Sequence, residues 1–238
     1  MLATLAPIFA LLLSVSLLLM GNGLQVTLLP VRASIEEFSA LEIGVLGSAY
    51  FLGFAGGCIF GPRIVRRVGH IRTFTAMATI ASCVVLMHAF LLNPVVWWVL
   101  RAATGICFAV LYMVIESWLN ERATNQNRGT VFSIYTVINL TVVTIGQMML
   151  ILDEASNFLL FSLASILVSL AAVPVALSTS DEPRPIESVK INFAKLYRTS
   201  PVGVVACLAV GLSNGSFWAL APVFAQGDAG NPTTVAIF

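Results

Sequence analysis

The stretch VVWWVLRAATGICFAVLYMVIESWL, Val95–Leu119, carries an arginine inside an otherwise apolar run. As a helix rising ~1.5 Å per residue, it would reach about 37 Å, enough to cross a bilayer core of ~30 Å. Tryptophans stand at both ends, as is typical of the aromatic belts at the two membrane surfaces. They are Trp97, Trp98 and Trp118. The stretch therefore predicts a membrane-spanning helix with a charge inside it.

One side of this predicted helix is small or polar. At ~100° per residue, its members fall within about 80° of one another around the helix axis. They are Arg101, Gly105, Ala109, Tyr112 and Glu116. A charge at membrane depth is costly unless it faces protein or a water-filled cavity. We therefore expect the rest of the chain to form a bundle that encloses this side.

The composition of the whole chain is that of an integral membrane protein. Of its 238 residues, 58% are hydrophobic and 10% are charged, which excludes an ordinary soluble domain. The apolar N-terminus has no basic segment before it and no clear cleavage site, so we interpret it as a first span rather than a signal peptide. A G-x-x-x-x-G-K-[ST] phosphate loop is absent from the sequence. We expect no cofactor, no metal and no nucleic-acid partner.

Seven apolar runs are long enough to cross a membrane. They are Thr4–Leu29, Leu41–Val65, Thr73–Leu92, Val95–Leu119, Gly129–Leu152, Ser156–Ser178 and Pro201–Ala225. Ten basic residues gather in alternate connections between these runs: Arg63, Arg66, Arg67, Arg72, Arg122, Arg128, Arg184, Lys190, Lys195 and Arg198. By the positive-inside rule, this side and the N-terminus are predicted to be cytoplasmic, with the chain in the inner (plasma) membrane.

A short repeat suggests how the chain is divided. Asn22–Val31, NGLQVTLLPV, and Asn214–Val223, NGSFWALAPV, share Asn, Gly, Leu, Pro and Val in the same order. Parallel repeats of six spans are an arrangement used by transporters. We predict a six-helix half over 1–178, a cytoplasmic linker over 179–200, and the first helix and start of the second helix of another half over 201–238. About five further spans would complete such a repeat, so a truncated chain is expected.

Three motifs resemble the major facilitator superfamily. GPRIVRRVGHIR, residues 61–72, is similar to the family's loop G-x-x-x-D-R-x-G-R-R, and Arg101-x-x-x-Gly105 resembles its R-x-x-x-G signature, which is implicated in proton coupling. ESWLNERATNQNRG, residues 116–129, resembles the YcaD-like branch. Gly61, Arg67, Gly69 and Arg72 lie at or close to the expected positions of the loop. Arg66 stands where the family usually has Asp, so the usual charge contact at the cytoplasmic face is in doubt. A plain basic turn is the alternative reading of this loop.

The resemblance implies an all-α polytopic fold: one major facilitator-like six-helix half-bundle plus a seventh transmembrane helix. In the family, spans one, four, seven and ten line a central cavity. This puts forward Asn22, Gln25, Arg101, Tyr112, Asn214 and Trp218 as cavity residues. In the fifth span, Asn139 and Gln147 join them, on the same side as Thr136 and Gly146. Each polar side chain has an alternative role as a hydrogen-bond partner of another helix.

Other residues are expected to serve packing or gating. Gly53, Gly57 and Gly61 recur every four residues, which predicts a face for close helix contact. Glu116, near the predicted cytoplasmic end of its span, is expected to form a gating charge pair with Arg67 or Arg128. The alternative is a carboxylate that carries a proton.

The predicted function is secondary transport of a small solute by rocking of two halves around a midplane site, with protons as the coupling ion. The partners would be the lipid bilayer, the solute, protons and the remaining half that completes the cavity. A non-transporting bundle, such as a sensor or partner subunit, is one alternative. A membrane hydrolase is another, because Gly211–Gly215 matches G-x-S-x-G. That pattern lies within a span, and neither His70 nor His88 offers a base at its depth, so we do not expect an enzyme.

Overall fold

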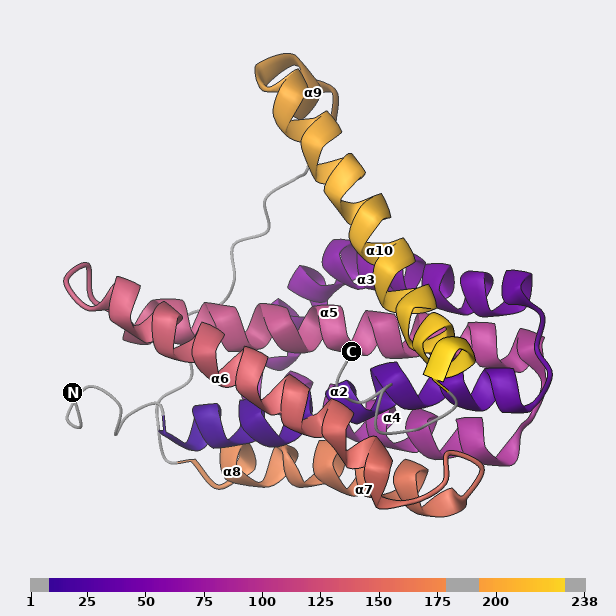
Figure 1. Ribbon diagram of the computed structural model, residues 1–238. Coiled ribbons are helices and arrows are strands. Elements are labelled where there is room, and N and C mark those ends of the chain that lie inside the picture. The colour runs from indigo at the N-terminus through magenta and orange to yellow at the C-terminus, as the bar shows by residue number, and fades with distance from the viewer. Residues whose placement is uncertain (1–8, 179–192, 230–238) are drawn as a thin grey trace.

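The computed structural model describes residues 9–178 and 193–229, and these form helices with no strand among them (Figure 1). The helices are α2 (Phe9–Ile35), α3 (Ala40–Val68), α4 (His70–Phe90), α5 (Pro94–Arg122), α6 (Arg128–Met148) with the 3₁₀ turn η2 (Met149–Leu152), α7 (Phe158–Leu170), α8 (Ala172–Ala176), α9 (Phe193–Thr199) and α10 (Pro201–Ala229).

Six of the helical segments in the described part are long and apolar enough to cross a membrane, and they coincide with the first six predicted spans. The all-α membrane fold is therefore confirmed. The seventh predicted run lies in α10, of which the described residues Pro201–Gly211 form an apolar helix. The predicted start of the first span, before Phe9, lies outside the described residues.

The first helix continues past Leu29, the approximate end of the first predicted span, through Pro30 to Ile35. A proline removes one backbone donor, but membrane helices tolerate it where neighbouring helices support the turn. Here Pro30 is buried, and one turn later Arg32 pairs with Glu36 at 2.7 Å. These contacts hold the extra turns in place.

Two helix caps fix where α3 and α5 begin. Ser39 and Glu42 form a capping box in which the Ser39 N–H donates to Glu42 Oε2 at 2.7 Å. Before α5, Asn93 Oδ1 accepts from the N–H groups of Val95 and Val96, and Pro94 occupies the first helical position. Because α5 starts at Pro94, Arg101 lies two turns inside the helix.

Glycines bring α3 and α5 into backbone contact, as the spacing of Gly53, Gly57 and Gly61 predicts. A Cβ on Gly53 would overlap the backbone of Ala102, and one on Gly57 would come within 2.7 Å of the Ile106 carbonyl. A glycine of α5 makes a similar contact with α3, since a Cβ on Gly105 would lie 2.8 Å from the Phe54 nitrogen. The two helices form the most extensively packed pair in the fold.

A second glycine contact joins α2 to α6. A Cβ on Gly23 would lie 3.0 Å from Val143 Cα, and one on Gly146 would lie 3.0 Å from the Leu24 nitrogen. Gly146, which the sequence places on the polar side of its span, is therefore a packing residue. The α2–α6 and α3–α5 pairs stand as two close-packed walls, with the cavity described below between them.

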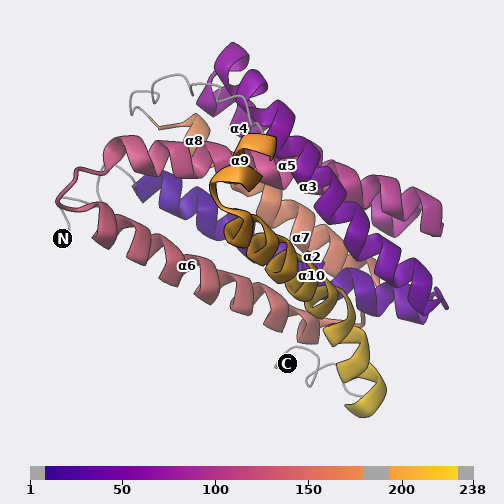
Figure 2. The ribbon, with the colours of Figure 1, turned by 90° about the horizontal axis from the view of Figure 1, so that it is seen from above.

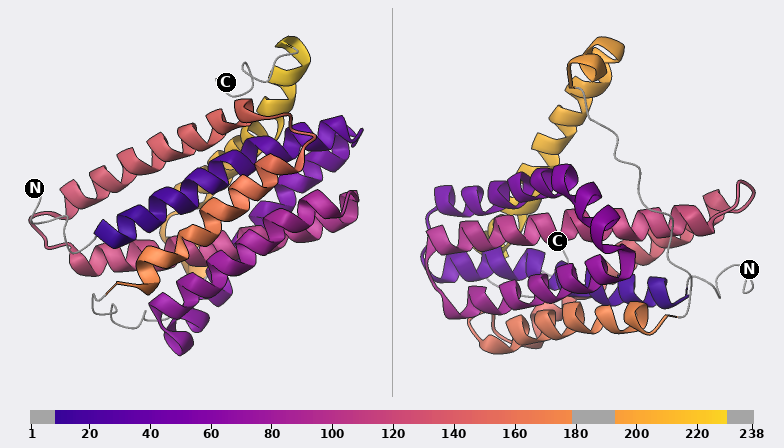
Figure 3. Two further views of the ribbon diagram at one scale, coloured as in Figure 1. Left: turned by 90° about the horizontal axis from the view of Figure 1, so that it is seen from below. Right: turned by 180° about the vertical axis from the view of Figure 1, so that it is seen from behind.

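The remaining helices close the back of the bundle and cross its front. α4 and α7 lie side by side (Figure 3), linked by Ser82 Oγ, which is 2.7 Å from Ser165 Oγ and 2.6 Å from Ser169 Oγ. On the opposite face, α10 crosses obliquely over α2 and α3, between α3 and α6 (Figure 2). α10 thus covers parts of α2 and α3 on the front of the bundle.

Candidate functional site

A cavity of about 400 Å³ lies between α2, α3, α5 and α6. Its lining comes from all four helices: Asn22, Val26, Leu29, Pro30, Ile43, Leu46, Gly47, Tyr50, Phe51, Arg101, Tyr112, Asn139, Leu140, Val143, Thr144 and Gln147. The volume falls within the range of small-molecule sites in proteins. Apolar side chains make up most of the wall, with a few polar groups among them, as is usual where a site must hold and orient a solute.

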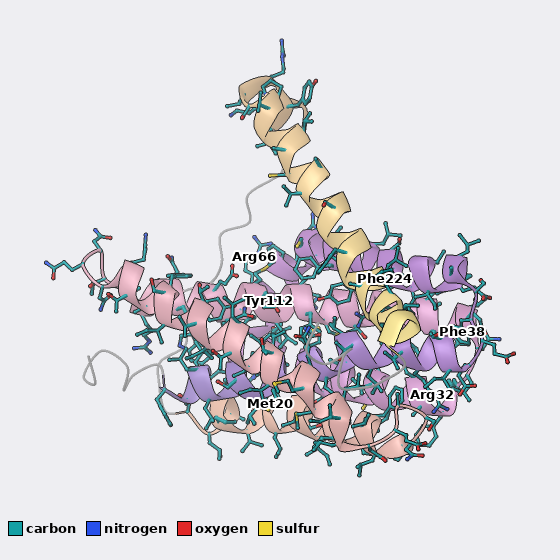
Figure 4. All side chains as sticks on the ribbon, viewed as in Figure 1. Met20, Arg32, Phe38, Arg66, Tyr112 and Phe224 are labelled. Carbon is teal, nitrogen blue, oxygen red and sulfur yellow. The ribbon has the colours of Figure 1, made fainter. Side chains whose placement is uncertain are left out.

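The structure brings together many of the predicted cavity residues. Those that line the cavity are Asn22, Arg101, Tyr112, Asn139 and Gln147. Tyr112 lies near the middle of the bundle (Figure 4). Asn214 and Trp218 lie on α10, but their side chains are outside the described residues. Their predicted place in the cavity stays a prediction.

Gln25 is placed differently from its prediction. Its side chain is fully buried within the helix packing and is not part of the cavity wall. Neither its amide nitrogen nor its amide oxygen has a hydrogen-bond partner. Three residues along a helix correspond to a turn of about 300°, so Gln25 points about 60° away from Asn22 around the helix axis and toward the neighbouring helices.

Arg101 is the one charged side chain in the described lining of the cavity. Only 7% of its surface is exposed, and Nη1 has no hydrogen-bond partner. Its guanidinium carbon lies 4.6 Å from the centre of the Tyr50 ring, a cation–π contact. No ion pair or hydrogen bond holds Arg101 within the part of the chain that the structure describes.

An aromatic cluster packs around Tyr50, the ring partner of Arg101. Tyr50 lies 6.0 Å from Phe54 between ring centres, and Phe54 lies 6.2 Å from Tyr112. Phe108 adds a second ring contact with Tyr112, at 6.3 Å between ring centres. Packed rings hold their neighbours in fixed positions, because aromatic side chains have few rotamers and bury a large area. The cluster therefore sets where the Tyr50 ring and the guanidinium meet.

Asn22 provides a second unsatisfied polar group at the cavity. It is 8% exposed, and its Oδ1 has no hydrogen-bond partner. Buried side-chain amides in proteins normally find partners, because an unpaired one loses its hydration without compensation. The cavity wall thus presents a cation and an amide, both available to a bound solute.

The residues of the loop motif lie at one end of the bundle, away from the cavity. Gly61 packs against α5, where a Cβ would lie 3.2 Å from Val110 Cγ2. Gly69 alone separates α3 from α4 and has φ 91°, a conformation that favours glycine. Arg66, Arg67 and Arg72 are exposed. His70, placed in a loop by the sequence reading, is instead the buried first residue of α4, with Nε2 3.1 Å from Ser117 Oγ.

The expected gate pair of Glu116 is not formed in this conformation. Neither Arg67 nor Arg128 makes an ion pair with it in the described part of the structure, and all three side chains are exposed. An exposed ion pair gains little over hydration, so the structure gives no energetic reason for it to persist. The gating role of Glu116 stays a prediction.

Sequence reasoning missed the contribution of α3 to the cavity. Tyr50 precedes Gly53 by three residues and therefore lies on the same face of the helix as the predicted glycine stripe. Since that stripe contacts α5, the residue one turn before it is the one placed to reach Arg101. This spacing is the signal that identifies Tyr50. Ile43 and Phe51, which are ordinary apolar residues of a span, carry no such signal.

Comparisons with known proteins agree with this architecture. Residues 11–238 match the family model of the Major Facilitator Superfamily. The protein described as "Uncharacterized MFS-type transporter YcaD" is 24% identical over 220 residues in Escherichia fergusonii and 26% identical over 222 residues in Escherichia coli O17:K52:H18. Each alignment covers 92% of this chain, and the chain spans 58% of the relative's length.

The fold is also similar to solved structures. The crystal structure of the nucleoside transporter NupG superposes with a TM-score of 0.71 and 15% identity, covering 96% of this chain and 62% of NupG. A mutant of NupG gives a TM-score of 0.71 and 14% identity, covering 94% of this chain and 60% of the mutant chain. Since the family model matches residues 11–238 and the described part has six candidate membrane spans, the chain belongs to the major facilitator superfamily.

Proposed function

We propose that this chain carries the substrate-binding surface of a secondary active transporter that moves a small solute by alternating access. The observation that supports this most directly is Arg101, a nearly buried cation without an ion-pair partner, in the wall of a cavity between membrane-spanning helices. Ionisable residues at membrane depth are typical of substrate and ion pathways. The other half of the cavity would come from the part of the transporter that corresponds to the rest of its longer relatives.

Protons are the proposed coupling ion. The sequence offers no phosphate loop for nucleotide-driven transport, and Arg101 with Gly105 has the spacing of the family's proton-coupling signature. Gly105 also has a structural role here, because its contact with α3 fixes the depth of Arg101 beside Tyr50. The distribution of basic residues supports an inner-membrane orientation with a cytoplasmic N-terminus.

A hydrolase is disfavoured by the position of its supposed motif. Gly211–Gly215 lies inside α10, whereas a nucleophile of this kind needs a sharp strand-to-helix turn to expose its hydroxyl. A non-transporting sensor has no specific observation in its favour. The likeness to NupG supports the fold alone, so nucleosides enter the test as candidates and not as the expected substrate.

The test uses the complete gene product that contains this chain, reconstituted into liposomes that enclose a pH-sensitive dye. Sugars, nucleosides, amines and carboxylates are added outside, one at a time. We expect at least one solute to drive proton movement into the liposomes, and Arg101→Ala to abolish the response. Arg63→Ala is the matched control, because Arg63 is exposed and donates only to Ile59 of its own helix at 3.3 Å. A membrane that shows no solute flux with any compound would contradict transport.

A further inference from the structure

We propose that the solute is a small organic monocarboxylate with a second hydrogen-bonding group, and that Arg101 binds its carboxylate. This inference rests on the proposed transport function and names the class of substrate. It goes beyond the fold and the family, which leave the charge of the solute open. Three features of the cavity carry it: the state of Arg101, the position of Tyr50 and the absence of acidic groups from the described wall.

The first feature is an uncompensated charge. Arg101 is 7% exposed, and Nη1 has neither a hydrogen-bond partner nor appreciable contact with solvent. Removing a guanidinium from water is unfavourable unless a counter-charge and hydrogen bonds replace its hydration. The described residues supply only an aromatic ring, which compensates a part of that loss. A bound anion would supply the rest.

The second feature is the way in which Tyr50 engages the cation. The guanidinium carbon lies over the ring, 4.6 Å from its centre, and Nη1 has no hydrogen-bond partner, so Tyr50 contacts the cation through its ring. A guanidinium donates its hydrogen bonds in its own plane, and two parallel N–H groups at its edge match the two oxygens of a carboxylate. Because a ring contact does not use these N–H groups and Nη1 has no partner among the described residues, Nη1 is left for the solute. Lysine, with a point charge and no planar fork, would not reproduce this geometry.

The third feature is the remainder of the wall. No Asp or Glu lines the cavity in the described part of the chain, so a cationic solute would meet Arg101 without a counter-charge. A single cation matches one negative charge. Asn22, Asn139 and Gln147 add amides that can donate or accept, and Asn22 Oδ1 has no partner. Together they select a monoanion that also carries a hydroxyl or a similar group.

The apolar wall and the volume limit the body of the solute. Leu29, Pro30, Ile43, Leu46 and Phe51 face the cavity, and its volume is about 400 Å³. Such a space suits a compact molecule with an apolar part that packs against these side chains. Mandelate combines the required features in one probe, because it has a carboxylate, an adjacent hydroxyl and a phenyl ring.

The test measures ligand-induced thermal stabilisation of the complete gene product in detergent at constant ionic strength. Mandelate, mandelamide, phenylacetate and phenyl phosphate are compared as probes. We expect mandelate to raise the melting temperature in a dose-dependent way, and mandelamide to bind about ten- to a hundredfold more weakly, because it lacks the charge-assisted hydrogen bonds. Phenylacetate, which lacks the hydroxyl, should bind less tightly than mandelate, and the phosphate dianion should bind less tightly than either carboxylate.

Variants assign the effect to the guanidinium. Arg101→Gln should remove the preference for mandelate over mandelamide, and Arg101→Lys should restore only a part of it. The melting temperature without ligand shows that each variant is folded. Equal binding of mandelate and mandelamide, tighter binding of the phosphate, or no stabilisation by either carboxylate would overturn the proposal.

Transport measurements distinguish a failure of this inference from a failure of the proposed function. If liposomes take up only neutral or cationic solutes, transport stands and the assignment of a carboxylate fails. If mandelate binds through Arg101 but no solute crosses the membrane, the assignment of the site stands and the proposed transport fails.

Discussion

Arg32 and Arg101 both belong to membrane-spanning helices, and the protein treats them in opposite ways. Arg32, which Figure 4 labels, lies near the end of α2 and has an 11% exposed side chain. It pairs with Glu36 at 2.7 Å and donates to the carbonyls of Ala155 and Ser156. Arg101, two turns into α5, is 7% exposed. Its guanidinium contacts the ring of Tyr50 and, among the described residues, has no ion-pair partner. Arg32 Nε is also buried without a hydrogen-bond partner, but Arg32 has an ion pair and two backbone acceptors, whereas Arg101 has no ion pair or hydrogen bond in the described part of the chain.

The difference suggests a criterion for a structural charge and for a proposed functional one when the burial of the two side chains is similar. Arg32 joins the end of α2 to the segment before α7, so its contacts hold two elements together. Arg101 joins no element through an ion pair, although folding has placed it beside a ring and a cavity. Unsatisfied buried groups are rare in stable proteins, and each one needs an explanation. In the proposed function, a solute that binds at Arg101 would provide it.

The largest expected effect is on transport by Arg101→Ala. The initial rate of uptake of the solute identified in the liposome screen should fall roughly a hundredfold, because charge-assisted hydrogen bonds contribute about 1.5–3 kcal/mol. Arg32→Ala should change that rate far less once the amount of folded protein is matched. Radiolabelled uptake into liposomes measures both. Similar losses in the two variants would remove the functional distinction between the arginines.

The next prediction concerns stability, where the order reverses. Arg32→Met should lower the free energy of unfolding by about 1–3 kcal/mol, because it breaks hydrogen bonds from a charged donor to backbone carbonyls. Arg101→Met should leave stability unchanged or raise it, since an apolar side chain replaces an uncompensated buried charge. Thermal unfolding in one detergent compares them. A marked loss of stability in Arg101→Met would reveal a structural partner for Arg101.

Tyr50 should produce a smaller effect on binding. Tyr50→Leu removes a cation–π contact of about 0.5–2 kcal/mol, so binding of mandelate should weaken between about twofold and thirtyfold. Tyr50→Phe keeps the ring and should stay within about twofold of the native protein. Titration of tryptophan fluorescence measures these affinities. If the two variants weaken binding equally, the hydroxyl of Tyr50, and not its ring, would be the group that matters.

Glu36→Gln should have the smallest effect. Its carboxylate is 27% exposed and pairs with Arg32 within the same helix, an arrangement that contributes about 0.3–0.5 kcal/mol. The melting temperature should fall slightly at low salt, and the difference should shrink at high salt. A large fall that salt does not reduce would mean that Glu36 helps to hold Arg32 against the carbonyls of Ala155 and Ser156.

The sequence predicted the elements that depend on local pattern. Hydropathy located the six spans, and the recurrence of Gly53, Gly57 and Gly61 predicted a close helix contact, because both follow from helix geometry along one segment. The buried charge at Arg101 predicted that its helix lines the cavity, and Arg101 is part of the cavity wall. Asn139 and Gln147 were found in the same way, as polar residues within an apolar run.

What the sequence could not give depends on contacts between segments. The partner of Arg101 is an aromatic residue of another helix, and pairing across helices leaves no periodic signal. Gln25 was expected in the cavity because it is polar and near Asn22, but packing turned it inward. The extension of α2 beyond Leu29 depends on the contacts of Arg32, which lie far away in sequence.

The backbone contact between α3 and α5 has a consequence for motion. A Cβ on Gly105 would overlap the carbonyl of Tyr50, so these two positions touch without any side chain between them to absorb a displacement. Arg101 stands one turn before Gly105, and its ring partner is Tyr50 itself. Any sliding of one helix along the other therefore changes the alignment of cation and ring directly. Relative movement of α3 and α5 would thus be coupled to the geometry of the Arg101–Tyr50 contact, at the place where the solute would bind.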